Sequence, residues 1–289
     1  MHPSAMINGK LFFDTYVAHL GNVTVVDIGA QDVNGSLRDV CPANAQYIGV
    51  DFANARGVDI VLTDPYTLPF ENDSVDVVVS SSCLEHSEMF WLVFNEVLRT
   101  LKPTGLFYMN VPSNGAFHRY PVDCWRFYPD AGNALIKWAQ RSGINAALIE
   151  SYTTPQQADI WNDFVAVFAK DASHLDRYPN RILSNLSAFE NGFMHGSDEI
   201  IRLIATAEDA RLVEDLKSKL NVEAARVASI WSDLAATLQR SENLAQELSR
   251  SKDETLDVVR HVETLKQQIH EMESSISWKM TALFRALNR

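Results

Sequence analysis

From residue 22 onwards, short runs of β-branched residues alternate with stretches whose apolar residues recur at helical spacing. The runs are nearly continuous in Val and Ile, which is typical of strands buried on both faces of a sheet. This alternation predicts a mostly parallel sheet covered by helices. We therefore expect an α/β fold, a Rossmann-like doubly wound sheet of seven strands, at residues 22–28, 46–51, 58–62, 75–81, 105–111, 146–152 and 162–170.

Two helices are expected within this alternation. Residues 87–101 place Phe90, Phe94 and Leu98 at helical spacing, and Pro103 prevents the helix from continuing. Residues 130–142 form the second helix, which Gly143 closes.

The periodicity fades in a polar stretch that contains Pro179, Gly192 and Gly196. Proline and glycine among polar residues mark loops and boundaries. We therefore expect the sheet-bearing domain to span residues 1–175 and a linker to span 176–205.

The chain from 197 to 289 holds neither proline nor glycine, and its apolar residues follow a seven-residue repeat. One register begins at Val213 and a second begins at Leu216; fourteen of their twenty positions are apolar. A repeat of this length predicts a coiled coil, at 206–273. A helix about 100 Å long cannot bury such a stripe by itself. Homo-oligomerisation would cover it, and an intrachain hairpin that breaks near Ser241 and Ser251 is the alternative.

Composition excludes several classes of protein. The 289 residues carry 25 basic and 37 acidic side chains, a net charge of −12, so nucleic acid is not an expected partner. Three cysteines without a C-x-x-C pair suggest neither a disulfide framework nor a metal site. The start lacks the pattern of a signal peptide and no apolar run reaches membrane-spanning length, so we expect a cytoplasmic protein.

The first strand carries the earliest sign of chemistry. It contains Asp27 and ends at Gly29, where the chain is expected to turn tightly into a helix whose N–H groups face a ligand. The second strand ends in Asp51, about 20 residues later, where nucleoside-binding domains grip ribose hydroxyls. Without the further glycines that accommodate a pyrophosphate, these residues predict a nucleoside ligand that lacks a diphosphate.

Residues 63–109 include Leu-Pro-Phe, an aspartate before a Val-rich strand, Leu-Glu-His, and a helix that ends in Leu-Arg-x-Leu-Lys-Pro-x-Gly. In this order the motifs resemble class I S-adenosylmethionine-dependent methyltransferases, over roughly residues 20–170. The resemblance implies S-adenosyl-L-methionine as cofactor. It also implies that Asp27 and Gly29 support the methionine end, Asp51 the ribose and Asp64 the adenine, while Ser81 and Ser82 line the methionine side.

The chain departs from that family at two places. Gln31 and Asp32 stand in the first loop where the family has a second flexible glycine. Only eight residues (51–58) pass between the second and third strands, too few for the usual helix.

Residues 110–131 follow the fifth strand without helix or strand period, at the edge where open sheets bind ligands. We expect an acceptor site here, with Arg119, Tyr120, Trp125 and Arg126 binding substrate. The alternative is structural: Arg119, Asp123 and Arg126 form a salt-bridged hinge, and Trp125 packs in the core with Phe127.

Methyl transfer to a hydroxyl requires that its proton leave, and histidine is the natural base. His118 and His86 are the candidates, with Asp123 as a further catalytic residue, and a mechanism in which neither histidine is the base remains open. No metal ligand set is expected.

Residues 274–289 carry Lys279, Arg285 and Arg289 without an acid and place apolar residues on one helical face. A basic amphipathic helix of this kind can lie on an anionic membrane, and continuation of the coiled coil is the alternative. The pattern Ser-x-Ser-Trp-Lys-x-Thr-Ala-x-x-Arg also resembles a tail of bacterial enzymes that assemble cell-surface polysaccharide.

These features favour a homo-oligomeric methyltransferase that O-methylates a sugar or glycan, including a lipid-linked glycan, in bacterial cell-surface polysaccharide biosynthesis. Its tail would contact the inner membrane peripherally. Two other hypotheses remain: an enzyme acting on a small metabolite or a protein, and a non-catalytic methyltransferase-like scaffold oligomerised by its coiled coil.

Overall fold

The computed structural model describes residues 2–156, 161–281 and 285. The chain divides into two compact units, residues 1–208 and 209–289. Each unit is described by itself.

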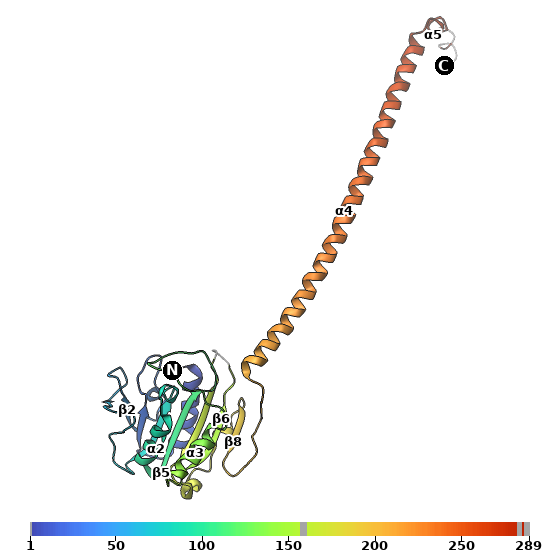
Figure 1. Cartoon of the computed structure of the whole chain (residues 1–289). Helices are drawn as coiled ribbons and strands as arrows, with labels where there is room; N and C mark the ends of the chain where they lie inside the picture. The colour runs from blue at the N-terminus through green and yellow to red at the C-terminus, as the bar shows by residue number, and fades with distance from the viewer. Residues whose placement is uncertain (1, 157–160, 282–284, 286–289) are drawn as a thin grey trace. The chain divides into compact units, whose positions relative to one another are not determined.

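The first unit is built on a single eight-stranded sheet (Figure 1). The strands are β1 (Thr24–Ile28), β2 (Gln46–Asp51), β3 (Ile60–Val61), β4 (Val75–Ser81), β5 (Leu101–Pro112), β6 (Ala147–Thr153), β7 (Asp163–Ala169) and β8 (Glu190–Met194), in the order β3-β2-β1-β4-β5-β7-β6-β8. The strands from β1 to β5 pair in parallel, whereas β7 runs antiparallel to both β5 and β6. This arrangement confirms the predicted Rossmann-like sheet and adds an eighth strand.

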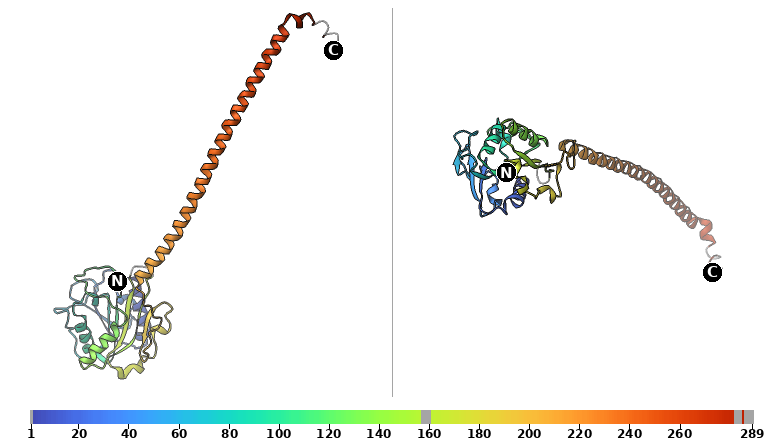
Figure 2. Two further views of the ribbon diagram at one scale, coloured as in Figure 1. Left: turned by 45° about the vertical axis from the view of Figure 1, so that its right-hand side comes forward. Right: turned by 90° about the horizontal axis from the view of Figure 1, so that it is seen from below.

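Helices cover both faces of the sheet. On one face, α2 (Phe90–Thr100) and α3 (Ala131–Arg141) bury the apolar side chains that their sequence spacing predicted. On the other face, α1 (Pro3–Phe12) and the π-helical turn η1 (Phe13–Val17) build a second core with Phe12, Phe13 and Tyr16. The right-hand view of Figure 2 shows the blue N-terminal segment and the green helices on opposite sides of the sheet.

The sequence pattern did not reveal α1 because part of its buried face is polar or small. Asn8 is buried and its amide donates to Oδ1 of Asn110 at 2.9 Å. A Cβ on Gly9 would lie 2.3 Å from a methyl carbon of Leu37, so glycine permits the helix to pack this closely. A helix that buries asparagine and glycine shows no apolar stripe in the sequence.

The helix expected directly after the first strand does not form. The segment after β1 is a loop followed by a short 3₁₀ turn, η2 (Leu37–Val40), which ends just before Pro42. Proline cannot continue a helix because it lacks the N–H donor. Residues 52–59, which connect β2 to β3 and are all described, form no helix. This agrees with the short connection expected from the sequence.

The segment expected to be a linker, 176–205, contains part of the sheet. Strand β8 pairs antiparallel with β6, and Gly192 bridges to Ile201. The buried carboxylate of Glu150 on β6 accepts hydrogen bonds from the N–H groups of Ile182 (2.7 Å) and Leu183 (3.0 Å). The segment is therefore an integral part of the first unit, which extends to residue 208.

The second unit is dominated by one continuous helix, α4 (Glu208–Ser274), of 67 residues. It passes through Ser241 and Ser251 without a break, so this segment does not fold into the alternative hairpin. Its heptad side chains are exposed in the single chain, as at Leu220 (68%) and Leu248 (58%).

A short helix, α5 (Ile276–Met280), follows α4. The expected tail helix at 274–289 extends beyond it, and most of its expected apolar face, including Leu283, Phe284 and Leu287, lies outside the described residues. Across the part of the chain that the structure describes, no helix combines the length and the apolar character needed to span a bilayer.

Candidate functional site

A cavity of about 400 Å³ lies at the carboxyl ends of β1, β2 and β4. The chain leaves β1 towards β2 on one side, and β4 lies on the other, so the strand order reverses beside β1. In open α/β sheets this reversal point is where ligands bind. Among the predicted site residues, the cavity is lined by Gly29, Asp51, Ser81, Ser82, His86 and Tyr120.

The turn at Gly29 brings the ends of two strands together. Gly29 has φ +81°, and a Cβ there would lie 2.5 Å from Sγ of Cys83. Ser82 also adopts a positive φ, of 51°, which is unusual for a residue with a side chain and recurs at functional sites. These two backbone conformations shape the floor of the cavity.

The loop after Gly29 is held by its own side chains. Asp32 accepts the N–H of Gly35 at 2.9 Å and pairs with Arg56 at 2.9 Å. Its neighbour Gln31 lines the cavity. Asp32, which stands where the family has a flexible residue, therefore stabilises the loop through its side chain.

One wall combines a carboxylate with apolar surfaces. Asp51 is only 7% exposed, and its Oδ1 accepts the N–H of Ala53 at 3.0 Å. Phe52, Leu62, Pro65 and Tyr66 line the cavity as well, and the sequence analysis did not single them out. The signal available for Phe52 was its place directly after Asp51.

Two predicted cofactor residues are engaged elsewhere. Asp27 is buried, and its carboxylate accepts the hydroxyl of Tyr47 at 2.6 Å; burial raises the pKa of Asp27 to about 7. Asp64 accepts the Tyr66 N–H and the Thr67 hydroxyl within its own turn, and these bonds hold the pKa of Asp64 below its usual value. Neither carboxylate is among the described residues that line the cavity.

The loop after β5 also lines the cavity. Tyr120, Pro121 and Val122 line it together with His86 from η3 (Leu84–His86), the turn after β4. Nδ1 of His86 donates to the carbonyl of Val122, which leaves Nε2 as the basic nitrogen. Burial lowers the pKa of His86, so the ring is neutral at pH 7.

The loop 113–130 is stabilised by an ion pair. Asp123, with a side chain only 2% exposed, accepts bonds from Arg126 at 2.7 and 2.9 Å, and these bonds lower the pKa of Asp123 to about 2. Asp123 also accepts the backbone N–H of His118 at 2.7 Å. The Asp123–Arg126 pair matches the structural alternative for these two residues.

The other predicted substrate residues differ in their surroundings. Trp125 donates from Nε1 to the carbonyl of Ser87 at 2.9 Å and packs edge-on against Phe90. Arg119 is exposed. Of Arg119, Tyr120, Trp125 and Arg126, only Tyr120 is among the described residues at the cavity.

Glu85 is a further site residue that the sequence analysis did not select. Its side chain is 1% exposed, and this burial raises the pKa of Glu85 to about 8. Its backbone carbonyl accepts the N–H groups of Cys124 (2.8 Å) and Trp125 (3.2 Å), which attaches the loop 113–130 to η3. The Glu-His pair in the sequence was the available signal.

Comparison with known proteins finds similarity to methyltransferases over part of the chain. Residues 9–109 match the family model described as "Methyltransferase domain". An uncharacterized methyltransferase of Mycobacterium leprae is 32% identical over 112 residues, covering 31% of this chain and 42% of the relative. The chain thus spans less than half the length of this curated relative.

Solved structures show the same kind of similarity at low identity. The 1,6-didemethyltoxoflavin-N1-methyltransferase of Burkholderia thailandensis is 14% identical, with a TM-score of 0.46 over 58% of this chain and 79% of that one. A putative methyltransferase of Haloferax volcanii, in complex with the Trm112 activator, is 18% identical, with a TM-score of 0.42 over 58% and 89%.

Proposed function

Because this chain carries an S-adenosylmethionine-dependent methyltransferase domain, we propose that it transfers a methyl group to a hydroxyl oxygen of a sugar or glycan. The observation that carries the proposal is the cavity at the carboxyl ends of β1, β2 and β4, with the Asp51 carboxylate in its wall.

The residues present fit the nucleoside cofactor. Asp51 supplies a nearly buried carboxylate for the ribose hydroxyls, and Phe52, Leu62 and Tyr66 supply the apolar walls that an adenine ring needs. Ser81 lines the same cavity, and its buried hydroxyl has no hydrogen-bond partner among the described residues. An orphaned buried hydroxyl is costly unless a ligand satisfies it.

The cofactor, when bound, supplies an electrophilic methyl group, and the protein aligns the acceptor with it. We assign the acceptor end of the cavity to His86 and Tyr120, which line the same cavity as Asp51 and Phe52. The cofactor would supply the methyl group, with its sulfur as the leaving group, and Nε2 of His86 would accept the hydroxyl proton of the acceptor. Of the two candidate histidines, His86 is the one among the lining residues.

Exposed aromatic rings support a sugar acceptor. Phe117, Tyr120 and Tyr128 are 75%, 51% and 69% exposed. All three belong to the loop 113–130, which lines the cavity at Tyr120. Aromatic faces beside polar groups suit the apolar faces and hydroxyls of sugars. The polysaccharide setting rests on the sequence pattern at 275–285 and the acceptor chemistry together.

The heptad face of α4 supports homo-oligomerisation. Val213, Val227 and Leu234 belong to one register of the seven-residue repeat, and their side chains are between 44% and 49% exposed in the single chain. A second copy of this chain presents a matching stripe, and burial of both stripes drives association. We further propose that Lys279 and Arg285, in a segment without acids, favour a peripheral position at the inner membrane of the cell.

Calorimetry with S-adenosylhomocysteine tests the cofactor site, and we expect binding at one site per chain. No binding up to millimolar concentration would favour the non-catalytic scaffold. Transfer of labelled methyl groups into lipid-linked glycans, small metabolites and proteins then identifies the acceptor. Labelling confined to metabolites or proteins would refute the glycan assignment while retaining the enzyme.

A further inference from the structure

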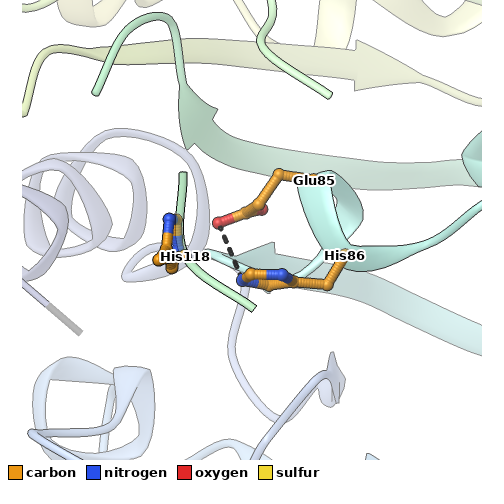
Figure 3. Close-up of side chains that lie close together, drawn as sticks. All are labelled: Glu85, His86 and His118. Atoms are coloured by element: carbon orange, nitrogen blue, oxygen red, sulfur yellow. Dashed lines mark ion pairs between the residues drawn. The ribbon is translucent and has the colours of Figure 1, made fainter. Parts of the chain in front are cut away.

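Glu85, His86 and His118 form a cluster beside the cavity (Figure 3). Glu85 and His86 come from η3, directly after β4, and His118 comes from the loop between β5 and α3. Each residue offers one ligand atom, and these atoms all lie within 4.8 Å of one another. Oε1 of Glu85 lies 3.8 Å from Nε2 of His86.

In the described part of the chain, one oxygen of the buried Glu85 carboxylate lacks a hydrogen-bond partner. Its side chain is 99% removed from solvent, and Oε2 has no hydrogen-bond partner among the described residues. A buried carboxylate is stabilised by hydrogen bonds, a paired charge or a metal ion. The guanidinium of Arg126 makes two bonds to Asp123, and its buried Nε has no hydrogen-bond partner among the described residues.

Both imidazole rings are oriented by backbone carbonyls. Nδ1 of His86 faces the carbonyl of Val122, and Nδ1 of His118 lies 3.1 Å from the carbonyl of Ala116. A carbonyl can only accept, so Nδ1 of His86 carries the proton and its Nε2 keeps the lone pair. Nδ1 of His118 lies between the carbonyl of Ala116 and Nη2 of Arg126, which is 3.5 Å away. Histidines that ligate metals are fixed in this manner by a hydrogen bond from the other ring nitrogen.

We propose that Glu85, His86 and His118 bind a divalent transition-metal ion of the zinc type at the acceptor end of the cavity. Two imidazole nitrogens and one carboxylate oxygen suit such ions, whereas magnesium and calcium prefer oxygen ligands alone. Ligands about 2.1 Å from a tetrahedral zinc ion lie about 3.4 Å apart, so side-chain movements of about 1 Å complete the site.

The site extends the proposed function. His86 also lines the cavity, so a coordination position left open by the three residues would face the acceptor. An oxygen bound there would ionise more readily, because a metal ion lowers the pKa of a hydroxyl that it binds. In this arrangement Nε2 of His86 binds the ion, the proton of the bound hydroxyl passes to solvent, and this route replaces the direct proton transfer to His86.

The test is titration of the chelator-treated, dialysed full-length protein with Zn²⁺ by calorimetry, and with Co²⁺ by visible absorption. We expect one site per chain and Co²⁺ bands of a site with nitrogen and oxygen ligands. Glu85→Gln, His86→Gln and His118→Gln should each weaken Zn²⁺ binding at least about tenfold. His195→Gln, at an exposed histidine outside the cluster, should leave it unchanged.

Binding of S-adenosylhomocysteine is measured on every variant, to show that the cavity is intact. Failure of the wild-type protein to bind Zn²⁺ at one site, or full binding by all three cluster variants, would overturn the metal site. A protein that binds Zn²⁺ but does not bind S-adenosylhomocysteine, or does not transfer methyl groups, would contradict the proposed function and leave the metal site intact.

Discussion

The imidazole rings of His86 and His118 meet edge to face, with their centroids 4.9 Å apart and their planes at 88°. The two residues come from different connections of the sheet, since His86 follows β4 and His118 follows β5. Their contact joins the loop 113–130 to the cavity that carries Asp51. It places the two candidate bases of the sequence analysis in one cluster with Glu85.

Asp51→Ala should abolish measurable binding of S-adenosylhomocysteine, a loss of at least about 100-fold, because a carboxylate that accepts two ribose hydrogen bonds is removed. Calorimetry on the purified variant measures this loss, and circular dichroism checks the fold. Asp64→Asn is the matched control, because its side-chain oxygen can keep the bond from the Tyr66 N–H and its NH₂ group can donate to the Thr67 hydroxyl. Wild-type affinity in Asp51→Ala would contradict the ribose assignment.

Asp27 should make the first unit less stable as the pH rises. Its pKa increases from 3.8 to about 7 on folding, so the folded state holds a proton that the unfolded chain releases. The contribution is complete below about pH 4 and is lost as the pH rises through about 7, a decrease of up to about 4 kcal/mol. Between pH 5 and 8, the free energy of unfolding measured in urea should fall with rising pH in the wild-type protein. It should fall less steeply in Asp27→Asn. If the unfolding free energies of the two proteins differ by the same amount at every pH, Asp27 is not the cause of the pH dependence.

The Asp123–Arg126 pair should stabilise the loop 113–130. A double-mutant cycle with Asp123→Ala and Arg126→Ala should give a coupling of about 1 to 3 kcal/mol in urea unfolding, because the carboxylate is buried and bound twice. Each single variant should also increase proteolytic cleavage within the loop. Additive effects of the two substitutions would show that the pair contributes nothing beyond its separate residues.

Leu234→Lys should reduce the self-association that we propose for the full-length chain, because it places a charge in the heptad seam. Light scattering over a concentration series measures the change as a lower mass at equal concentration. Ala235→Lys, one position outside the seam on the same helix, should retain the wild-type mass. Equal masses for the Leu234 variant and the wild-type protein would refute association through this face.

Glu150→Ala should cost at least about 2 kcal/mol of unfolding free energy. The substitution leaves the Tyr16 hydroxyl and the N–H groups of Ile182 and Leu183 without their acceptor in a buried position. Urea unfolding measures the loss, and Glu71→Ala, at an exposed position, should change stability by less than about 0.5 kcal/mol. A similar small effect at both positions would contradict the role of Glu150.

Local patterns predicted much of the fold because buried parallel strands are almost purely apolar. The seven expected strands are all present, although β3 is shorter and β5 begins earlier, at Leu101. Helix α1 and strand β8 were not predicted because their contacts are distant and partly polar, as between Asn8 and Asn110. The expected helix after β1 is absent because Gly35, with φ +123°, interrupts the segment, and only the short turn η2 follows it.

The site was predictable where a residue ends a strand. Gly29, Asp51, Ser81 and Ser82 reach the cavity because the carboxyl ends of neighbouring strands meet at one edge. Side chains on loops were harder to place, since the bond between Asp64 and its own turn depends on local geometry. Glu85 is buried by residues that are distant in the sequence, and sequence spacing cannot predict such burial.

The late position of Ile182, Leu183 and β8 in the chain sets an order for folding during synthesis. Until these residues leave the ribosome, the carboxylate of Glu150 lacks two of its donors and the outer edge of β6 is unpaired. Residues 209–289 are translated only afterwards. A nascent chain can therefore cover the outer edge of β6 and complete its globular part before its long helix has been fully synthesised.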